Sequence, residues 1–200
     1  MSPIDGILLA AGESRRMGYP KPLLRLNADT FIEHTVSAML GSVARLVVVL
    51  GAHAERVRPV LPRDQRLTVV ENPDWPLGQL SSLRIGLATI GRAAAAAMVH
   101  LTDHPTVRAA TYSALAAEFA RSSKQILIAR HNGRRGHPVI FAKGIFDELM
   151  RAPDAGGARV VVNADPSRVA YLDVDDPGVS LDLDTPADLA RAGLPPPPAG

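Results

Sequence analysis

The stretch GILLAAGESRRMGYPKPLL, residues 6–24, joins a short apolar run to a loop rich in glycine and basic residues. Gly12 and Gly18 stand six positions apart in it, with two arginines between them and Lys21 shortly after. Glycine lets backbone amides approach a ligand closely, and the cations Arg16 and Lys21 would offset the charge of a polyphosphate. The spacing is neither the G-x-x-x-x-G-K-[ST] of a P-loop nor the G-x-G-x-x-G of dinucleotide-binding proteins. The segment therefore predicts a strand followed by a polyphosphate-binding turn of another kind.

Apolar, β-branched runs recur along the chain and alternate with segments of helical character. The runs are apolar at consecutive positions, which is typical of strands that helices cover on both faces. We therefore expect an α/β fold, a three-layer α/β/α sandwich around a mostly parallel sheet. The expected strands are Gly6–Leu9, Arg45–Leu50, Leu67–Val70, Ala97–Leu101, Ile126–Ala129 and Val139–Phe141.

Helix and turn signals complete this outline. Thr30 and Glu33 have the spacing of a capping box, which predicts that a helix begins after Thr30. Thr185-Pro-Ala-Asp188 predicts the start of a final helix, and Gly193 its end. The sequence NGRRG at 132–136 predicts a tight reversal, so that residues 126–141 form either a hairpin or an excursion. We expect one domain, residues 1–193, and a proline-rich tail, residues 194–200.

Composition narrows the class of protein. With 200 residues, 46% of them hydrophobic, the chain can bury one substantial core. Its 22 Lys plus Arg nearly balance its 20 Asp plus Glu, and this small excess of positive charge does not favour nucleic-acid binding. The absence of cysteine excludes disulfides, thiolate nucleophiles and cysteine-bound metals. The N-terminal stretch lacks the basic leader of a signal peptide, and the apolar run 93–99 is too short to span a membrane. We expect a cytoplasmic protein with no membrane segment.

Asp103 follows the apolar run that we expect to be a central strand, in the sequence VHLTDHP at 99–105. Ligands of open α/β sheets bind at the carboxyl ends of the strands. A carboxylate there could bind Mg²⁺ between an α-phosphate and an attacking oxygen, although an aspartate before His-Pro is, by itself, more often a turn former.

A second loop, GQLSSLRIG at 78–86, leads into a helix whose leucines we expect in the core. Its free amides and the hydroxyls of Ser81 and Ser82 could bind a base, a ribose or an acceptor phosphate. Serine capping of a helix explains the same residues, and the two roles are compatible.

The opening loop resembles the L-A-A-G-x-S-x-R-M-G-x-x-K signature of the MobA-like NTP transferase family, whose fold is a Rossmann-like three-layer nucleotidyltransferase sandwich. Three further segments are similar to elements of its molybdenum cofactor cytidylyltransferase branch: the loop at 78–86, the sequence RGHPVIF at 135–141, which is similar to an R-x-G-H-P-V-x-F element, and the D-x-D-T-P-x-D ending at 182–188. The resemblance implies nucleotide binding by Leu9, Ala10, Ala11, Gly12, Arg16, Lys21, Gly78, Ser81, Ser82 and Asp103.

The same resemblance implies roles in catalysis, metal binding and acceptor binding. Lys21 and Arg16 would stabilise the leaving polyphosphate, and Asp103 would bind Mg²⁺ together with Asp184 or Asp182. His137, in the R-x-G-H-P-V-x-F element, would contact the acceptor. His104 would do so as well, and it stands where the family more commonly has methionine.

The activity implied is transfer of CMP from CTP to a phosphorylated acceptor with release of pyrophosphate. Ala10-Ala11-Gly12 is more typical of CTP-using members than an A-G-G form, and the implied acceptor is the molybdopterin cofactor. A molybdoenzyme apoprotein or its chaperone would then be a partner. Sugar phosphates, polyol phosphates and phospholactate are alternative acceptors, and a non-catalytic carrier of nucleotide or cofactor is an alternative from another class. A dinucleotide-dependent oxidoreductase lacks its required glycine loop.

Overall fold

The computed structural model describes residues 3–90 and 93–198 of the chain. Its strands are β1 Ile4–Ala10, β2 Arg25–Leu26, β3 Asp29–Thr30, β4 Leu46–Leu50, β5 Leu67–Glu71, β6 Ala96–Leu101, β7 Ile126–His131, β8 Arg134–Ala142 and β9 Val169–Asp173. Its α-helices are α1 Phe31–Leu40, α2 Ala54–Val57, α3 Gln79–Thr89, α4 Ala109–Arg121, α5 Phe146–Arg151, α6 Ala158–Ala164 and α7 Pro186–Arg191.

Seven strands form one sheet in the order β5-β4-β1-β6-β8-β7-β9. The pairs β5–β4, β4–β1, β1–β6 and β7–β9 are parallel, whereas β8 runs antiparallel to both of its neighbours. The expected mostly parallel sheet is thus confirmed. Since β1 lies between β4 and β6, the loop after β1 emerges at the centre of the sheet, beside the loop after β6.

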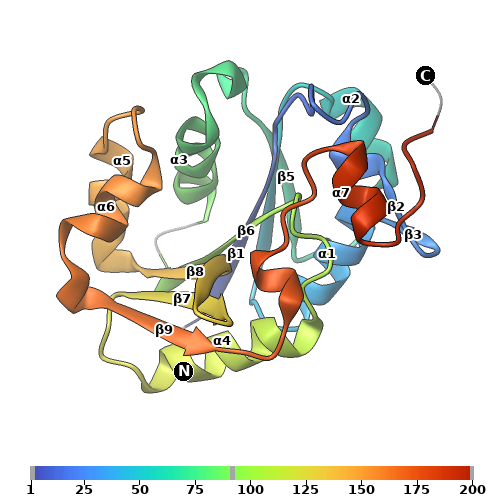
Figure 1. The fold of residues 1–200 in the computed structure, drawn as a ribbon. Coiled ribbons are helices and arrows are strands. Elements are labelled where there is room, and N and C mark those ends of the chain that lie inside the picture. The colour runs from blue at the N-terminus through green and yellow to red at the C-terminus, as the bar shows by residue number, and fades with distance from the viewer. Residues whose placement is uncertain (1–2, 91–92, 199–200) are drawn as a thin grey trace.

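Helices cover both faces of the sheet (Figure 1). Alternate side chains of each strand point to opposite faces, and they form two apolar clusters with these helices. One cluster packs α1, α2 and α4 against residues such as Leu8 and Val48. The other packs α3, α5 and α6 against residues such as Ile7 and Val49. This is the three-layer arrangement that the consecutive apolar positions predicted.

A third, smaller cluster joins the opening loop to the C-terminal segment. It contains Met17, Leu24, Leu26, Phe31, Leu183 and Leu189. Met17 and Leu183 are 2% and 0% exposed, so the segment that leads into α7 is held firmly against the loop that follows β1. These two parts of the chain, far apart in sequence, therefore meet at the carboxyl edge of the sheet.

Most local predictions are confirmed. All six predicted strands are present, Thr30 and Thr185 each cap their helix in a capping box, and Gly193 follows the last helix with a positive φ of 68°. Residues 126–141 are a hairpin, β7–β8, and its turn has Asn132 and Gly133 at positive φ. The sequence did not predict β9 or the small β2–β3 hairpin.

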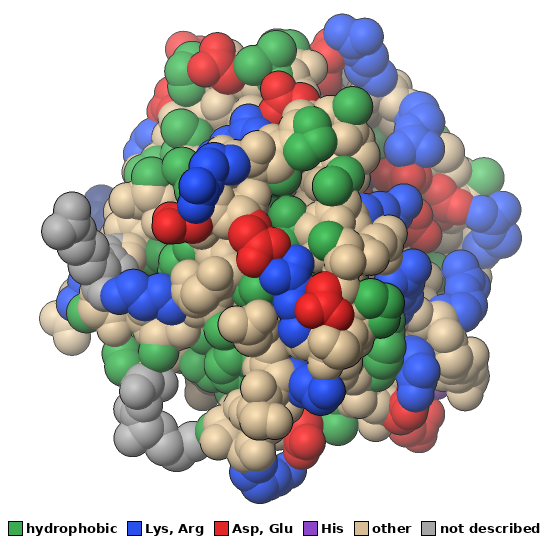
Figure 2. Space-filling model, turned by 90° about the vertical axis from the view of Figure 1, so that its left-hand side faces the viewer, with side chains coloured by type: hydrophobic (Ala, Val, Ile, Leu, Met, Phe, Trp, Pro, Cys, Tyr) green, Lys and Arg blue, Asp and Glu red, His purple; other side chains and the backbone are tan. Residues whose placement is uncertain are grey.

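After α7 the described residues 194–198 form no helix or strand, although Leu194 packs against the third cluster; residues 199 and 200 of the predicted tail lie outside the described residues. None of the helices in the described ranges has the length and apolar character needed to cross a bilayer. On the face over α5 and α6, basic and acidic side chains are interspersed, in keeping with the small formal net charge of +2 (Figure 2).

Candidate active site

The loop after β1 is folded around Ser14, which adopts a left-handed φ of 59°. The Ser14 carbonyl accepts from the amides of Met17 and Gly18 at 3.0 and 3.2 Å, and its hydroxyl accepts from the Lys21 amide at 3.0 Å. These bonds close the loop into a turn and fix the point where Lys21 leaves it. Sequence reasoning gave Ser14 no role, although a serine stands at this place in the family signature.

The amides of Gly12, Glu13 and Ser14 donate to no other group within residues 3–90 and 93–198. A Cβ built on Gly12 would meet no atom within 4 Å, so the packing of the protein itself does not require glycine there. The unpaired amides and the open space next to them suit an anion, which would satisfy the donors from outside the chain.

Two carboxylates converge on Lys21. Its ammonium group lies 2.8 Å from Asp184 Oδ1 and 3.5 Å from Asp103 Oδ2, and Arg16 donates to the other oxygen of Asp184 at 2.8 Å. The side chains of Lys21, Asp184 and Asp103 are 16%, 19% and 24% exposed. Burial acts to raise the pKa of Asp184, but the hydrogen bond and charge of Lys21 and the charge of Arg16 outweigh it, so that this pKa is lowered.

Backbone bonds and the third cluster bring these groups together. Leu183 donates its amide to the Asp103 carbonyl at 2.8 Å, which ties the C-terminal segment to the loop after β6. Thr102 binds the Leu9 carbonyl through its amide, at 3.1 Å, and through its hydroxyl, at 2.7 Å. The loops after β1 and β6 and the segment before α7 thus form one rigid edge around Lys21.

The pair Asp103 and Asp184 fits a divalent cation. Asp103 Oδ1 is buried and has no hydrogen-bond partner among the described residues, and His104 Nε2 lies 3.8 Å from it. An unpaired buried carboxylate oxygen beside a second carboxylate suits Mg²⁺, which usually takes one or two protein carboxylates and completes its shell with substrate phosphates and water. The described residues contain no group of three or more His, Cys, Asp or Glu that could hold a metal ion.

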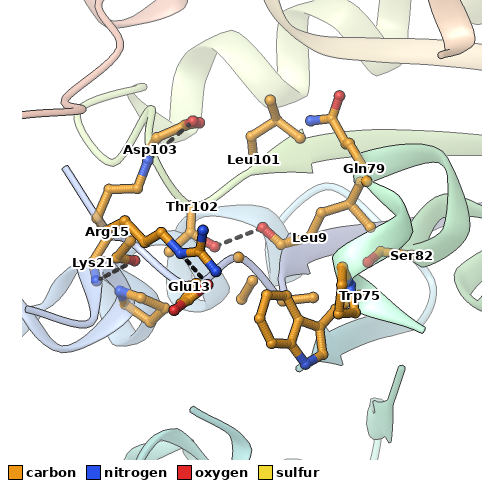
Figure 3. A pocket seen from close by; sticks show the side chains of 17 residues that line it. Leu9, Glu13, Arg15, Lys21, Trp75, Gln79, Ser82, Leu101, Thr102 and Asp103 are labelled. Atoms are coloured by element: carbon orange, nitrogen blue, oxygen red, sulfur yellow. Dashed lines mark hydrogen bonds and ion pairs between the residues drawn. The ribbon is translucent and has the colours of Figure 1, made fainter. Parts of the chain in front are cut away.

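A cavity of about 430 Å³ runs along this edge (Figure 3). Residues 9–15, Lys21 and Asp103 line one part of it, and Trp75, Gly78, Gln79 and Ser82 line the other. Figure 3 shows Lys21 and Arg15 across the cavity from Trp75, Gln79 and Ser82. Of the predicted nucleotide-binding residues, Leu9, Ala10, Ala11, Gly12, Lys21, Gly78, Ser82 and Asp103 line this cavity.

The remaining two predicted nucleotide-binding residues stand apart from the cavity wall. Arg16 is 71% exposed and is held to the site by its bond to Asp184. Ser81 is buried and bonded to the protein itself through Asp74 and Gly78. Arg15, which carried no predicted role, is 81% exposed and paired with Glu13.

A second cavity, of about 940 Å³, opens on the other side of Asp103. His104, His137 and Asp182 line it, so the structure brings both predicted acceptor residues together, with ring centroids 5.3 Å apart. Asp182 is exposed on this side, whereas Asp184 faces Lys21. It also has three basic side chains, Arg134, Arg135 and Arg159, none of which had a predicted role. Within the R-x-G-H-P-V-x-F element only His137 was assigned a contact, and Arg159 belongs to no motif.

His100 forms a buried cluster with the two histidines of this cavity and with Tyr112, whose ring centroid is 5.2 Å from its own. Burial and the neighbouring His137 and His104 lower the pKa of His100 well below its ordinary value. Burial and His104 likewise lower the pKa of His137, to about 4, against the opposing charge of Asp103. Both imidazoles are therefore neutral near pH 7.

The family is established by comparison with known proteins. Residues 6–169 match the model of the MobA-like NTP transferase domain, most of the chain. The chain belongs to this family and is a nucleotidyltransferase of the MobA-like type. Both the resemblance of the opening loop and the predicted fold are thereby confirmed.

Particular relatives point to molybdenum cofactor enzymes. The chain is 25% identical to the molybdenum cofactor cytidylyltransferase of Escherichia coli K12, with 96% of both chains covered. It is 30% identical to the molybdenum cofactor guanylyltransferase of Rhizobium leguminosarum bv. trifolii, with 96% and 92% covered. The crystal structure of Rv0371c from Mycobacterium tuberculosis H37Rv is similar to this structure, with a TM-score of 0.84. The two sequences are 31% identical, and the match covers 96% of this chain and 97% of Rv0371c. A second structure of Rv0371c is described as a complex with manganese.

Proposed function

We propose that this nucleotidyltransferase transfers CMP from CTP to a phosphorylated acceptor, molybdopterin, and releases pyrophosphate. One observation carries the proposal: Asp103 lines both cavities, while Lys21 stands against it on the side of the smaller one. The smaller cavity would hold the triphosphate and the larger one the acceptor, so that the reacting atoms would meet at Asp103.

The smaller cavity suits a nucleoside triphosphate. The free amides of Gly12 to Ser14 and the ammonium group of Lys21 are donors for phosphate oxygens, and Arg16 lies close enough to add a second positive charge. In the reaction, an acceptor phosphate oxygen attacks the α-phosphorus, the bond to the β-phosphate breaks and pyrophosphate leaves. Lys21 and the loop amides would stabilise the charge that develops on this leaving group.

Mg²⁺ is the proposed cofactor. Asp103 and Asp184 would hold it, because both carboxylates contact the ammonium group of Lys21. Asp182 is exposed and lines the larger cavity, so we do not assign it to the metal. When bound, the ion would reduce the repulsion between the attacking oxygen and the α-phosphate. The manganese complex described for the Mycobacterium tuberculosis relative supports a divalent-cation site in proteins of this fold.

The larger cavity suits an anionic acceptor of considerable size. Arg134, Arg135 and Arg159 supply positive charge, and guanidinium groups bind phosphate through paired hydrogen bonds. His104 and His137 would add two imidazole rings to the wall nearest Asp103. The similarity to molybdenum cofactor cytidylyl- and guanylyltransferases supports molybdopterin among the phosphorylated acceptors. We propose further that a molybdoenzyme or its chaperone receives the product from this protein, and that the reaction takes place in the cytoplasm.

The test combines four nucleoside triphosphates and Mg²⁺ with molybdopterin, a sugar phosphate, a polyol phosphate and phospholactate, followed by mass analysis of the products. We expect a cytosine dinucleotide of molybdopterin and stoichiometric pyrophosphate. Asp103→Asn is expected to lower pyrophosphate release by at least ~100-fold, while the exposed control Asp147→Asn keeps the wild-type rate. Unchanged turnover of Asp103→Asn with Mg²⁺ would reject the metal assignment. Thermal stabilisation by nucleotide without any pyrophosphate would identify a carrier instead.

A further inference from the structure

Asn72 lies immediately after β5, is 1% exposed and sits beneath the N-terminus of α3. Its carboxamide oxygen faces the backbone amide of Asp74 at 2.9 Å. Because a backbone N–H can only donate, the atom facing it must be the oxygen, and the other end of the carboxamide must be the NH₂ group. The orientation of this side chain is therefore fixed by the backbone.

The NH₂ group of Asn72 donates to two serines at once. Its nitrogen lies 2.8 Å from Ser81 Oγ and 2.9 Å from Ser82 Oγ. Since the two hydrogens of the amide are used in these bonds, both hydroxyl oxygens must act as acceptors towards Asn72. Each serine then keeps one hydrogen to donate elsewhere.

Ser81 uses its hydrogen within the protein. The Ser81 hydroxyl oxygen lies 2.8 Å from the Gly78 carbonyl oxygen and 3.0 Å from the Asp74 carbonyl oxygen. Carbonyl oxygens can only accept, so the hydroxyl must donate its hydrogen to them. Ser81 is therefore saturated and acts as a tie between α3 and the loop before it. It has no hydrogen left for a ligand.

Ser82 differs from its neighbour in this respect. It is 3% exposed and lines the smaller cavity, yet no group of the described chain accepts its hydroxyl hydrogen. In Figure 3 its side chain lies on the wall of the cavity, in the part that also contains Trp75 and Gln79, opposite Lys21. Ser82 is thus a buried hydroxyl whose free donor serves the end of the cavity away from the phosphate-binding loop.

We propose that Asn72 is a positioning residue that fixes Ser82 as a hydrogen-bond donor to the base of the bound nucleotide. With the triphosphate held by the Gly12 loop and Lys21, the base lies at the end formed by Trp75, Gln79 and Ser82. Ser82 donates there to an acceptor on the edge of the base, which in cytosine is O2 or N3. This inference rests on the proposed function, since it assumes a nucleoside triphosphate in the smaller cavity.

Three variants test the assignment by equilibrium binding of each of the four nucleoside triphosphates. The single tryptophan of the chain, Trp75, lines the cavity, and its fluorescence provides the signal. Ser82→Ala is expected to weaken CTP binding roughly tenfold by loss of one hydrogen bond and to raise KM with little change in kcat. Asn72→Asp replaces the donor by an acceptor that draws the Ser82 hydrogen to itself, so we expect a similar loss. Ser81→Ala is the matched control, which lowers the thermal midpoint and leaves CTP affinity intact.

The double variant separates positioning from a general effect of the new buried charge. If Asn72 acts through Ser82, adding Ser82→Ala to Asn72→Asp costs no further affinity; a second tenfold loss would overturn the proposal. An equal loss for all four triphosphates in Ser82→Ala would place the contact on sugar or phosphate and would also overturn it. Ser82→Ala removes only a hydroxyl, so it remains decisive even if the buried carboxylate of Asn72→Asp unfolds the chain. A wild-type protein that binds no nucleoside triphosphate would instead refute the proposed function.

Discussion

Replacing Lys21 by methionine keeps the apolar stem of the side chain and removes the charge that Asp103 and Asp184 share. We expect two opposite effects. Turnover with nucleotide should fall by ~10²–10³-fold, the usual cost of removing one donor that stabilises developing negative charge. Without nucleotide, the affinity for a divalent cation should rise, because the ammonium group no longer competes for the two carboxylates.

The size of the second effect follows from the contacts. Lys21 makes bonds of 2.8 and 3.5 Å to carboxylates that are 19% and 24% exposed. A charge-assisted hydrogen bond contributes about 1.5–3 kcal/mol, and every 1.4 kcal/mol is tenfold in affinity. We therefore expect the methionine variant to bind Mn²⁺ about 10- to 100-fold more tightly than the wild type in the absence of nucleotide.

The assay is titration of Mn²⁺ followed by electron paramagnetic resonance of the free ion, alongside pyrophosphate release with CTP, Mg²⁺ and acceptor. Lys124→Met is the matched control, because Lys124 is exposed and, among residues 3–90 and 93–198, donates from its ammonium group to the Ser167 carbonyl alone. A folded Lys21→Met protein that binds Mn²⁺ no more tightly than the wild type would refute the idea that Lys21 competes with a cation for the two carboxylates of the proposed metal site.

Two further predictions concern stability. Gly136→Ala should lower the free energy of unfolding by at least ~2 kcal/mol, because the new Cβ would lie 1.7 Å from the Val179 carbonyl oxygen. Gly144→Ala is the control and should cost little, because the nearest atom to its new Cβ is 3.5 Å away. Equal denaturant midpoints for the two variants would contradict the close approach of the backbone at Gly136 to that at Val179. The lowered pKa of His137, about 4, means that between pH 4 and 6.5 the unfolded chain binds a proton that the folded chain does not, so stability should fall as pH drops through this window. His137→Gln should remove up to about 3 kcal/mol of that dependence, measured by chemical denaturation at several pH values. An unchanged pH profile would show that folding does not lower the pKa of His137.

The sequence predicted the central strands because they are buried on both faces, which leaves an uninterrupted apolar run. Strand β9, Val169–Asp173, lies at the edge of the sheet and is only partly covered; its sequence does contain a short apolar run, VAYL, but four apolar residues alone do not distinguish a strand from part of a helix. The predicted strand at Val139 begins at Arg134 in the structure, and its first residues were missed because they are polar and exposed.

Local motifs also predicted much of the candidate site, because Gly12, Lys21 and Asp103 stand in loops next to strands that neighbour each other. The choice between Asp182 and Asp184 could not be predicted, since it depends on which one the third cluster turns towards Lys21. Asn72 was missed for a related reason. Its role lies in bonds to serines nine and ten positions later, and no spacing rule connects an asparagine after a strand with the helix beyond it.

The contact between Lys21 and Asp184 joins residues that are 163 positions apart in the chain. During translation the loop after β1 is therefore made long before Asp184, and Leu183 and Leu189, which pack against that loop, emerge equally late. A nascent chain can assemble its central strands at that stage while Lys21 still lacks one of its two counter-charges. The contact between Lys21 and Asp184, and the packing that supports it, can therefore form only after residues 183–189 have been synthesised.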